Sequence, residues 1–153
     1  MRDQAWLEQL LSHIWDEHFH DVPHGLPIKV VFGKRARTRL GSISVDPSLN
    51  IAVIRVTSLF KDPNVPEVVI KATLVHELCH YAHGFHSGLK RKHPQPHANG
   101  VIRQEFAERG LEDLYLTQKR WLKTNWAKIV KAHYPNLRLQ PRRRRVRIRP
   151  FKF

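Results

Sequence analysis

The sequence predicts an α+β fold, with one helix, a small three-stranded and mostly antiparallel sheet, and three further helices. Two observations predict it. Apolar residues recur at helical spacing in four segments, and short runs of β-branched residues lie between turn signals over residues 28–56. A chain of 153 residues with 41% hydrophobic residues is long enough to form one domain with a buried core.

The first helix is predicted over residues 3–20, where apolar side chains form a stripe at helical spacing. The residues of this stripe are Leu7, Leu10, Leu11, Ile14 and Trp15. Pro23, Gly25 and Pro27 then interrupt the pattern, because proline and glycine favour turns over helix. The chain is therefore expected to leave the helix and enter the sheet near residue 28.

Three strands are predicted next, over residues 28–32, 41–45 and 50–56, because these segments are rich in valine and isoleucine. A basic link, residues 33–39, joins the first two strands. The turn signal Asp46-Pro47-Ser48 separates the second strand from the third. We expect the three strands to form one small, mostly antiparallel sheet.

The second helix is predicted from Glu67 to about His83, with Pro66 at its start and Gly84 positioned to end it. Cys79 lies on its apolar face, so we expect a core residue there and not a nucleophile. Residues 85–97 are predicted to form a loop. The remaining helices are expected over residues 99–109 and 117–133.

A single cysteine excludes an internal disulfide and is typical of a reducing compartment. The chain shows no apolar run of signal-peptide length and none of the roughly 20 residues that span a bilayer. We therefore expect a cytoplasmic protein without a membrane partner.

The net charge of +14 is concentrated at the C-terminal end. Residues 135–153 contain eight cations and no acid, whereas residues 1–134 contain 19 cations and 13 acids. This asymmetry predicts a folded domain over 1–134, an Arg-rich tail over 135–153, and non-specific binding of nucleic acid, most simply DNA in the nucleoid. The alternatives are a solubilising tail or an edge strand. A second basic cluster, with a solvated hairpin as its alternative, comprises Lys34, Arg35, Arg37 and Arg39.

The segment from His76 to His80 reads His-Glu-Leu-Cys-His. On a helix, His76 and His80 lie about 6 Å apart along the axis and on one face, so both imidazoles can bind one metal ion. Glu77 is rotated by about 100° from His76, close to the metal without being a ligand. This arrangement is typical of zinc peptidases, in which zinc activates water and the glutamate acts as general base.

A catalytic zinc ion takes three protein ligands and keeps one position open. Six of the 11 histidines lie between residues 76 and 97, so the third ligand is not fixed by composition. His86 follows His76 by ten residues, and His93 and His97 flank a stiff Pro-Gln-Pro segment. Glu105, on the next predicted helix, is a further candidate. His83 is a weaker candidate, because it lies at the predicted end of the helix.

Several segments resemble the SprT-like (Spartan-type) metallopeptidase family, over roughly residues 5–112. They are residues 39–42, 50–51, Pro66 and, most strongly, 73–81. In that family a later histidine follows a proline at the start of another helix, and that helix ends near a glycine. Pro96, His97 and Gly110 match this pattern, so the resemblance implies that His97 is the third ligand.

The chain departs from the family in two ways. Val101 or Ile102 stands where an aromatic residue is usual, and no cysteine pair is present for the zinc ribbon that many members have. A neighbouring small family places His-Ser soon after the motif. His86-Ser87 resembles that pair and keeps His86 as the rival ligand.

The resemblance implies a zincin-like fold and an endopeptidase with one Zn²⁺ per chain, held by His76, His80 and His97. Glu77 is then the catalytic residue, and the substrate is protein associated with or cross-linked to DNA. Two alternatives stay open. One is a non-catalytic nucleic-acid-binding protein with a structural zinc, and the other is a zinc hydrolase with a non-peptide substrate.

Overall fold

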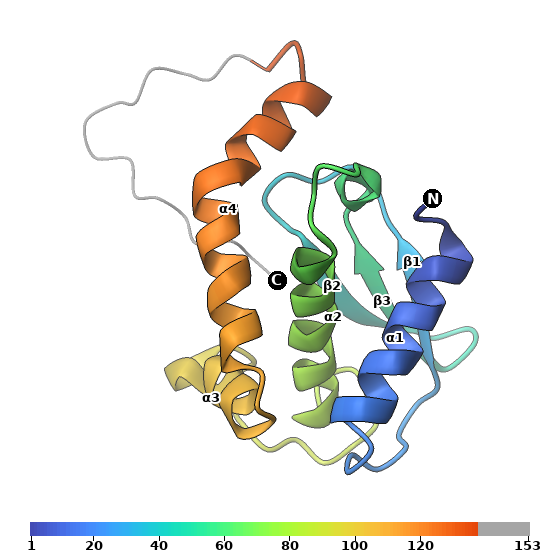
Figure 1. Cartoon of the computed structure of the whole chain (residues 1–153). Helices are drawn as coiled ribbons and strands as arrows, with labels where there is room; N and C mark the ends of the chain where they lie inside the picture. Colours follow the sequence, from blue (N-terminus) through green and yellow to red (C-terminus); the bar gives the residue numbers. More distant parts are fainter. Residues whose placement is uncertain (138–153) are drawn as a thin grey trace.

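The computed structural model describes residues 1–137, so most of the predicted basic tail, from residue 138 onward, lies outside the described residues. The fold is α+β, as the sequence predicts (Figure 1). The strands are β1 (Ile28–Phe32), β2 (Gly41–Asp46) and β3 (Ile51–Val56). The helices are α1 (Gln4–His18), α2 (Glu67–Ala82), α3 (Val101–Glu108) and α4 (Glu112–His133), with short 3-10 helices η1 (Ser58–Lys61) and η2 (Ala98–Gly100).

The sheet is mixed, which corrects the prediction of a mostly antiparallel one. Its strand order is β1-β3-β2, with β1 parallel to β3 and β2 antiparallel to β3. The chain reverses direction after β1 and again after β2, and β3 then inserts between the two earlier strands. The central Ile54 therefore pairs with Val30 on one side and with Ile43 on the other.

Helix α2 is the central element, lying between α1 and α4 and packed on the sheet (Figure 1). Its side chains are buried from Val69 to Ala82, Lys71 excepted, so the burial extends well beyond the expected apolar stripe. A helix buried on all sides lies inside a protein and not on its surface. Cys79 is a core residue, as expected, and the histidines of α2 lie in the same buried layer.

Helix α4 begins at Glu112, five residues before its predicted start. Gly110 adopts a left-handed backbone with φ of 72°, which ends α3 and lets the chain turn at once into α4. Glu112 and Asp113 then occupy the first turn, where acidic side chains favour the helix dipole. The buried Gln118 donates hydrogen bonds to Val69 O and Thr73 Oγ1, and so joins α4 to α2.

A chain of ionic contacts joins α3 to the loop after α1 and to the end of α2. Arg109 Nη1 lies 2.7 Å from Asp21 Oδ1, and Arg109 Nη2 lies 3.1 Å from Glu105 Oε1. The same Glu105 oxygen lies 3.7 Å from His83 Nε2. No helix within residues 1–137 combines the length and the apolar character that crossing a bilayer requires.

The ionic chain predicts a pH-dependent stability. His83 and then Arg109 hold the pKa of Glu105 at about 2, below its ordinary 4.5. Because the folded pKa is the lower one, the ionised carboxylate stabilises the fold above pH 4.5, and this stabilisation is lost as the pH falls towards 2. Because solvent partly screens this carboxylate, Glu105→Gln should reduce the free energy of unfolding by about 1–2 kcal/mol at pH 7 and by clearly less at pH 3.

Urea titrations of the metal-free protein at both pH values measure this difference. Glu108→Gln is the matched control, because Glu108 is exposed on the same helix and forms no ion pair with any described residue. Equal effects of the two substitutions at pH 7 would contradict the stabilising role of Glu105.

Candidate metal centre

Three imidazoles converge on one point in the structure. His76 and His80 lie one turn apart on α2, and His97 comes from the segment just before η2. His97 Nε2 lies 3.2 Å from His76 Nε2 and 3.1 Å from His80 Nε2. Nitrogen ligands at about 2.05 Å from a tetrahedral ion are about 3.3 Å apart, so these separations suit one shared metal ion.

The surroundings keep these imidazoles neutral, which is the form that binds metal. His76 and His80 are buried, and burial lowers the pKa of both, for His80 to about 3. Burial also lowers the pKa of His97, although that residue is exposed as a whole. The cluster is therefore buried on the α2 side and reached from solvent on the His97 side.

Glu77 lies beside this cluster in an unusual state. Its side chain is fully buried, and neither carboxylate oxygen has a hydrogen-bond partner among the described residues. Burial raises the pKa of Glu77 to about 8, and the positive charge of Arg39 opposes the rise. A buried carboxylate without partners costs free energy. A cation at the three imidazoles would offset that cost, so the residues present fit a metal ion.

Gly41, the first residue of β2, lies close to this carboxylate. A Cβ atom at this position would lie 2.7 Å from Thr73 Cγ2 and 3.2 Å from Glu77 Oε1. A larger residue there would force the Thr73 side chain to move. The edge strand β2 and helix α2 are therefore in close contact at Glu77, a contact that sequence reasoning did not find.

The other candidate ligands lie elsewhere. His86 is exposed with a left-handed backbone and does not join the three-histidine group. His83 stacks edge-on against His93, with ring centroids 4.5 Å apart, and also faces Glu105. These three residues share a neighbouring pocket. Within residues 1–137, the side chains that bring three ligand atoms together are those of His76, His80 and His97.

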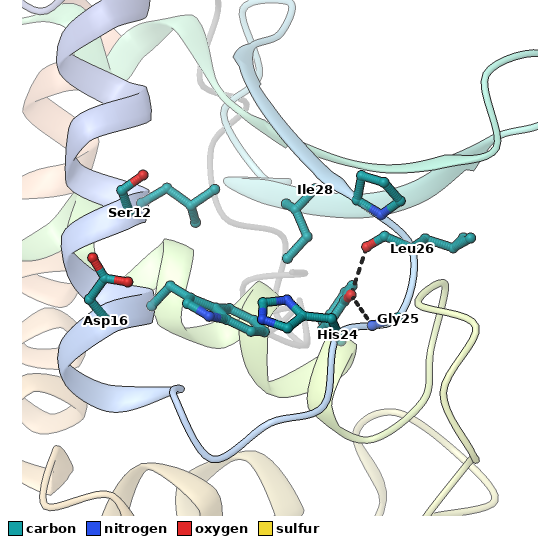
Figure 2. A pocket seen from close by; sticks show the side chains of 10 residues that line it. Ser12, Asp16, His24, Gly25, Leu26 and Ile28 are labelled. Carbon is teal, nitrogen blue, oxygen red and sulfur yellow. Dashed lines mark hydrogen bonds between the residues drawn. The ribbon is translucent and has the colours of Figure 1, made fainter.

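Tyr81, which follows His80 on α2, has its hydroxyl occupied by two hydrogen bonds. The hydroxyl donates to Leu26 O at 2.7 Å and accepts from Gly25 N at 2.9 Å. Gly25 and Leu26 line a pocket beside α1, opposite Ser12 and Asp16 (Figure 2). Tyr81 therefore anchors the segment before β1 to α2, and its hydroxyl does not serve the histidine cluster.

Comparison of the chain with protein-family models, with characterised proteins and with solved structures finds no match. Function is therefore inferred from the site itself. Three neutral imidazoles can hold a divalent cation with a position left open, and a basic carboxylate beside them can accept a proton. Together these groups are suited to the activation of water.

The geometry predicts one metal site per chain with His97 as a ligand. Zn²⁺ titrated into the metal-free protein should bind at one equivalent, and His97→Ala should weaken its affinity by about tenfold or more. His86→Ala is the matched control and should bind as the wild type does. Calorimetry or competition with a chelating dye measures the affinity. Full affinity in His97→Ala combined with a loss in His86→Ala would reverse the ligand assignment.

Proposed function

We propose that this chain is a zinc-dependent endopeptidase of the SprT-like type with a zincin-like fold. The observation that supports it most is the unpartnered, fully buried Glu77 beside the convergent nitrogens of His76, His80 and His97. A carboxylate next to the first histidine has a clear purpose in hydrolysis. The resemblance of residues 73–81 to the family supports the same conclusion from the sequence.

Zinc is the metal that suits this donor set best, because imidazole nitrogens are common zinc ligands and catalytic zinc sites use three protein ligands. When bound, zinc supplies a Lewis acid that polarises a carbonyl group and makes water more acidic. A structural zinc ion needs four protein ligands, and residues 1–137 bring only three together. This difference favours catalysis over the alternative of a structural zinc.

Glu77 is the proposed general base. Burial makes its carboxylate more basic, which increases its ability to take a proton from the attacking water. The Glu77 carboxyl group can then return this proton to the leaving amine. Arg39 acts in the opposite sense, because its charge favours the ionised carboxylate. Burial thus favours proton uptake by Glu77, and the charge of Arg39 and a bound cation would favour its ionised form.

The substrate is proposed to be protein associated with or cross-linked to DNA. This part of the proposal is supported by the family resemblance and by the excess of eight cations in residues 135–153. Such an enzyme would work in the cytoplasm on the nucleoid. The cationic tail would raise the local concentration of the enzyme near its substrate.

Replacement of Glu77 by glutamine tests the mechanism. The amide cannot accept a proton, so cleavage of an unfolded protein should slow by about a hundredfold or more. Zinc binding should persist, because Glu77 is not a ligand. Glu67→Gln on the first turn of α2 is the control, since Glu67 is exposed. Cleavage rate and zinc content are measured on the same preparations.

Unchanged cleavage by Glu77→Gln would show that Glu77 is not the base. Loss of zinc in that variant, with zinc retained by Glu67→Gln, would instead assign Glu77 a role in holding the metal. An ester substrate and a peptide substrate of matched sequence, assayed side by side, separate a peptidase from a hydrolase with a non-peptide substrate.

A further inference from the structure

After the two acids of its first turn, Glu112 and Asp113, the solvent face of α4 carries only positive charges. Its five cations are all exposed, and none forms an ion pair with any residue in the described range 1–137. They are Lys119, Arg120, Lys123, Lys128 and Lys131. No acidic residue occurs from residue 114 to the end of the sequence. From Lys119 to Lys131 this helix therefore presents a strongly cationic surface.

The fold attaches a second cationic segment to this helix. Trp126 Nε1 donates a hydrogen bond of 2.7 Å to Arg37 O, which fixes the link between β1 and β2 against α4. The Arg35 guanidinium lies 4.0 Å above the ring of Tyr134, just beyond the end of α4. Four exposed cations thereby join the α4 surface, namely Lys34, Arg35, Arg37 and Arg39.

This second segment also reaches the metal centre. Lys34, Arg39 and Arg55 line one pocket of the sheet edge together with Gly41, and no acidic residue lines it. Gly41 is the residue that contacts Glu77. The positive charge of Arg39 is also felt at the Glu77 carboxylate. The cationic surface thus extends from α4 to the neighbourhood of the proposed general base.

We propose that helix α4 and residues 33–39 form a binding surface for the phosphate backbone of duplex DNA, ending beside the metal centre. The inference rests on the proposed function for the reaction performed at the metal centre. It adds that the DNA to which the protein substrate is attached binds to this surface as well as to the tail. The two segments carry nine exposed cations, and the only acids on them are Glu112 and Asp113 in the first turn of α4. A polyanion is the partner that complements such a surface.

Size and composition favour DNA over an anionic membrane. The cations of α4 span Lys119 to Lys131, about 18 Å along the helix, which is about half of the roughly 34 Å of one turn of duplex DNA. A helix that binds a membrane surface exposes large apolar side chains. The exposed large apolar residues among those described are Met1, Val45 and Leu49, and none of them lies on α4.

The test neutralises one face of α4 in the full-length chain, with Lys119→Gln, Arg120→Gln and Lys123→Gln combined. The matched control removes the same charge elsewhere, with Lys29→Gln, Lys90→Gln and Lys92→Gln, all at exposed positions. A third variant neutralises the tail, with Arg142→Gln, Arg143→Gln and Arg144→Gln. Fluorescence anisotropy with a labelled 20-base-pair duplex measures affinity against salt concentration.

The slope of the logarithm of the binding constant against the logarithm of the salt concentration should become smaller in magnitude by about 2.7 in the α4 variant. Each of the three lost phosphate contacts removes about 0.9. The control should change the slope little, and the tail variant should show a further, separate loss. Equal slopes in the α4 variant and the control would overturn the proposal. So would an α4 variant that keeps its DNA affinity and loses only its binding to vesicles of phosphatidylserine, which would assign the surface to a membrane.

Two further measurements separate this inference from the proposed function. Zinc content and cleavage of an unfolded protein without DNA should be unchanged in the α4 variant. If the duplex results contradict the surface while cleavage persists, the surface alone is wrong. If the wild type binds zinc and DNA as expected yet cleaves no protein, the peptidase proposal alone is wrong.

Discussion

The burial of helix α2 on all sides is the constraint on which the rest of the structure depends. It places His76, Glu77 and His80 inside the core layer, where a charged side chain without partners is unfavourable. The imidazoles respond by remaining neutral, and the carboxylate responds by becoming more basic. Burial thus prepares both kinds of group for their proposed roles. The third imidazole, His97, has to come from outside the helix, and α3 with its ionic contacts positions the segment that brings it.

Much of the fold follows from local pattern. The strands over residues 28–32 and 51–56 and the helix over 67–82 lie where valine, isoleucine and apolar periodicity predict them. Strand order does not follow in the same way, because it depends on which strand finds the centre of the sheet. β3 is the most apolar strand and is buried at four of its six positions, so it takes the centre and makes its pairing with β1 parallel. The sequence pattern places the start of α4 at residue 117, five residues too late. The chain turns at Gly110, which has a left-handed backbone, and enters α4 at once.

The residues of the candidate site also differ in how far local sequence pattern predicts them. His76, Glu77 and His80 could be selected from spacing on one helix, since their geometry is fixed by 3.6 residues per turn. His97 could be selected only through a resemblance, because spacing along the chain left His86, His93 and Glu105 equal to it. Two contacts join elements that are far apart in sequence. They are the contact of Gly41 with Glu77 and the hydrogen bond from Trp126 to Arg37 O. Such contacts depend on packing, and no local pattern in the sequence indicates them.

The position of α4 explains how one small domain can combine two demands that conflict. The metal centre needs a low dielectric and few competing charges, whereas binding a polyanion needs many exposed cations. Helix α4 meets both demands by presenting Gln118, Leu122, Trp126 and Ile129 to the interior and its five cations to solvent. Gln118 donates to Val69 O and Thr73 Oγ1, so the cationic helix is fixed to α2 through a neutral amide and not through an ion pair.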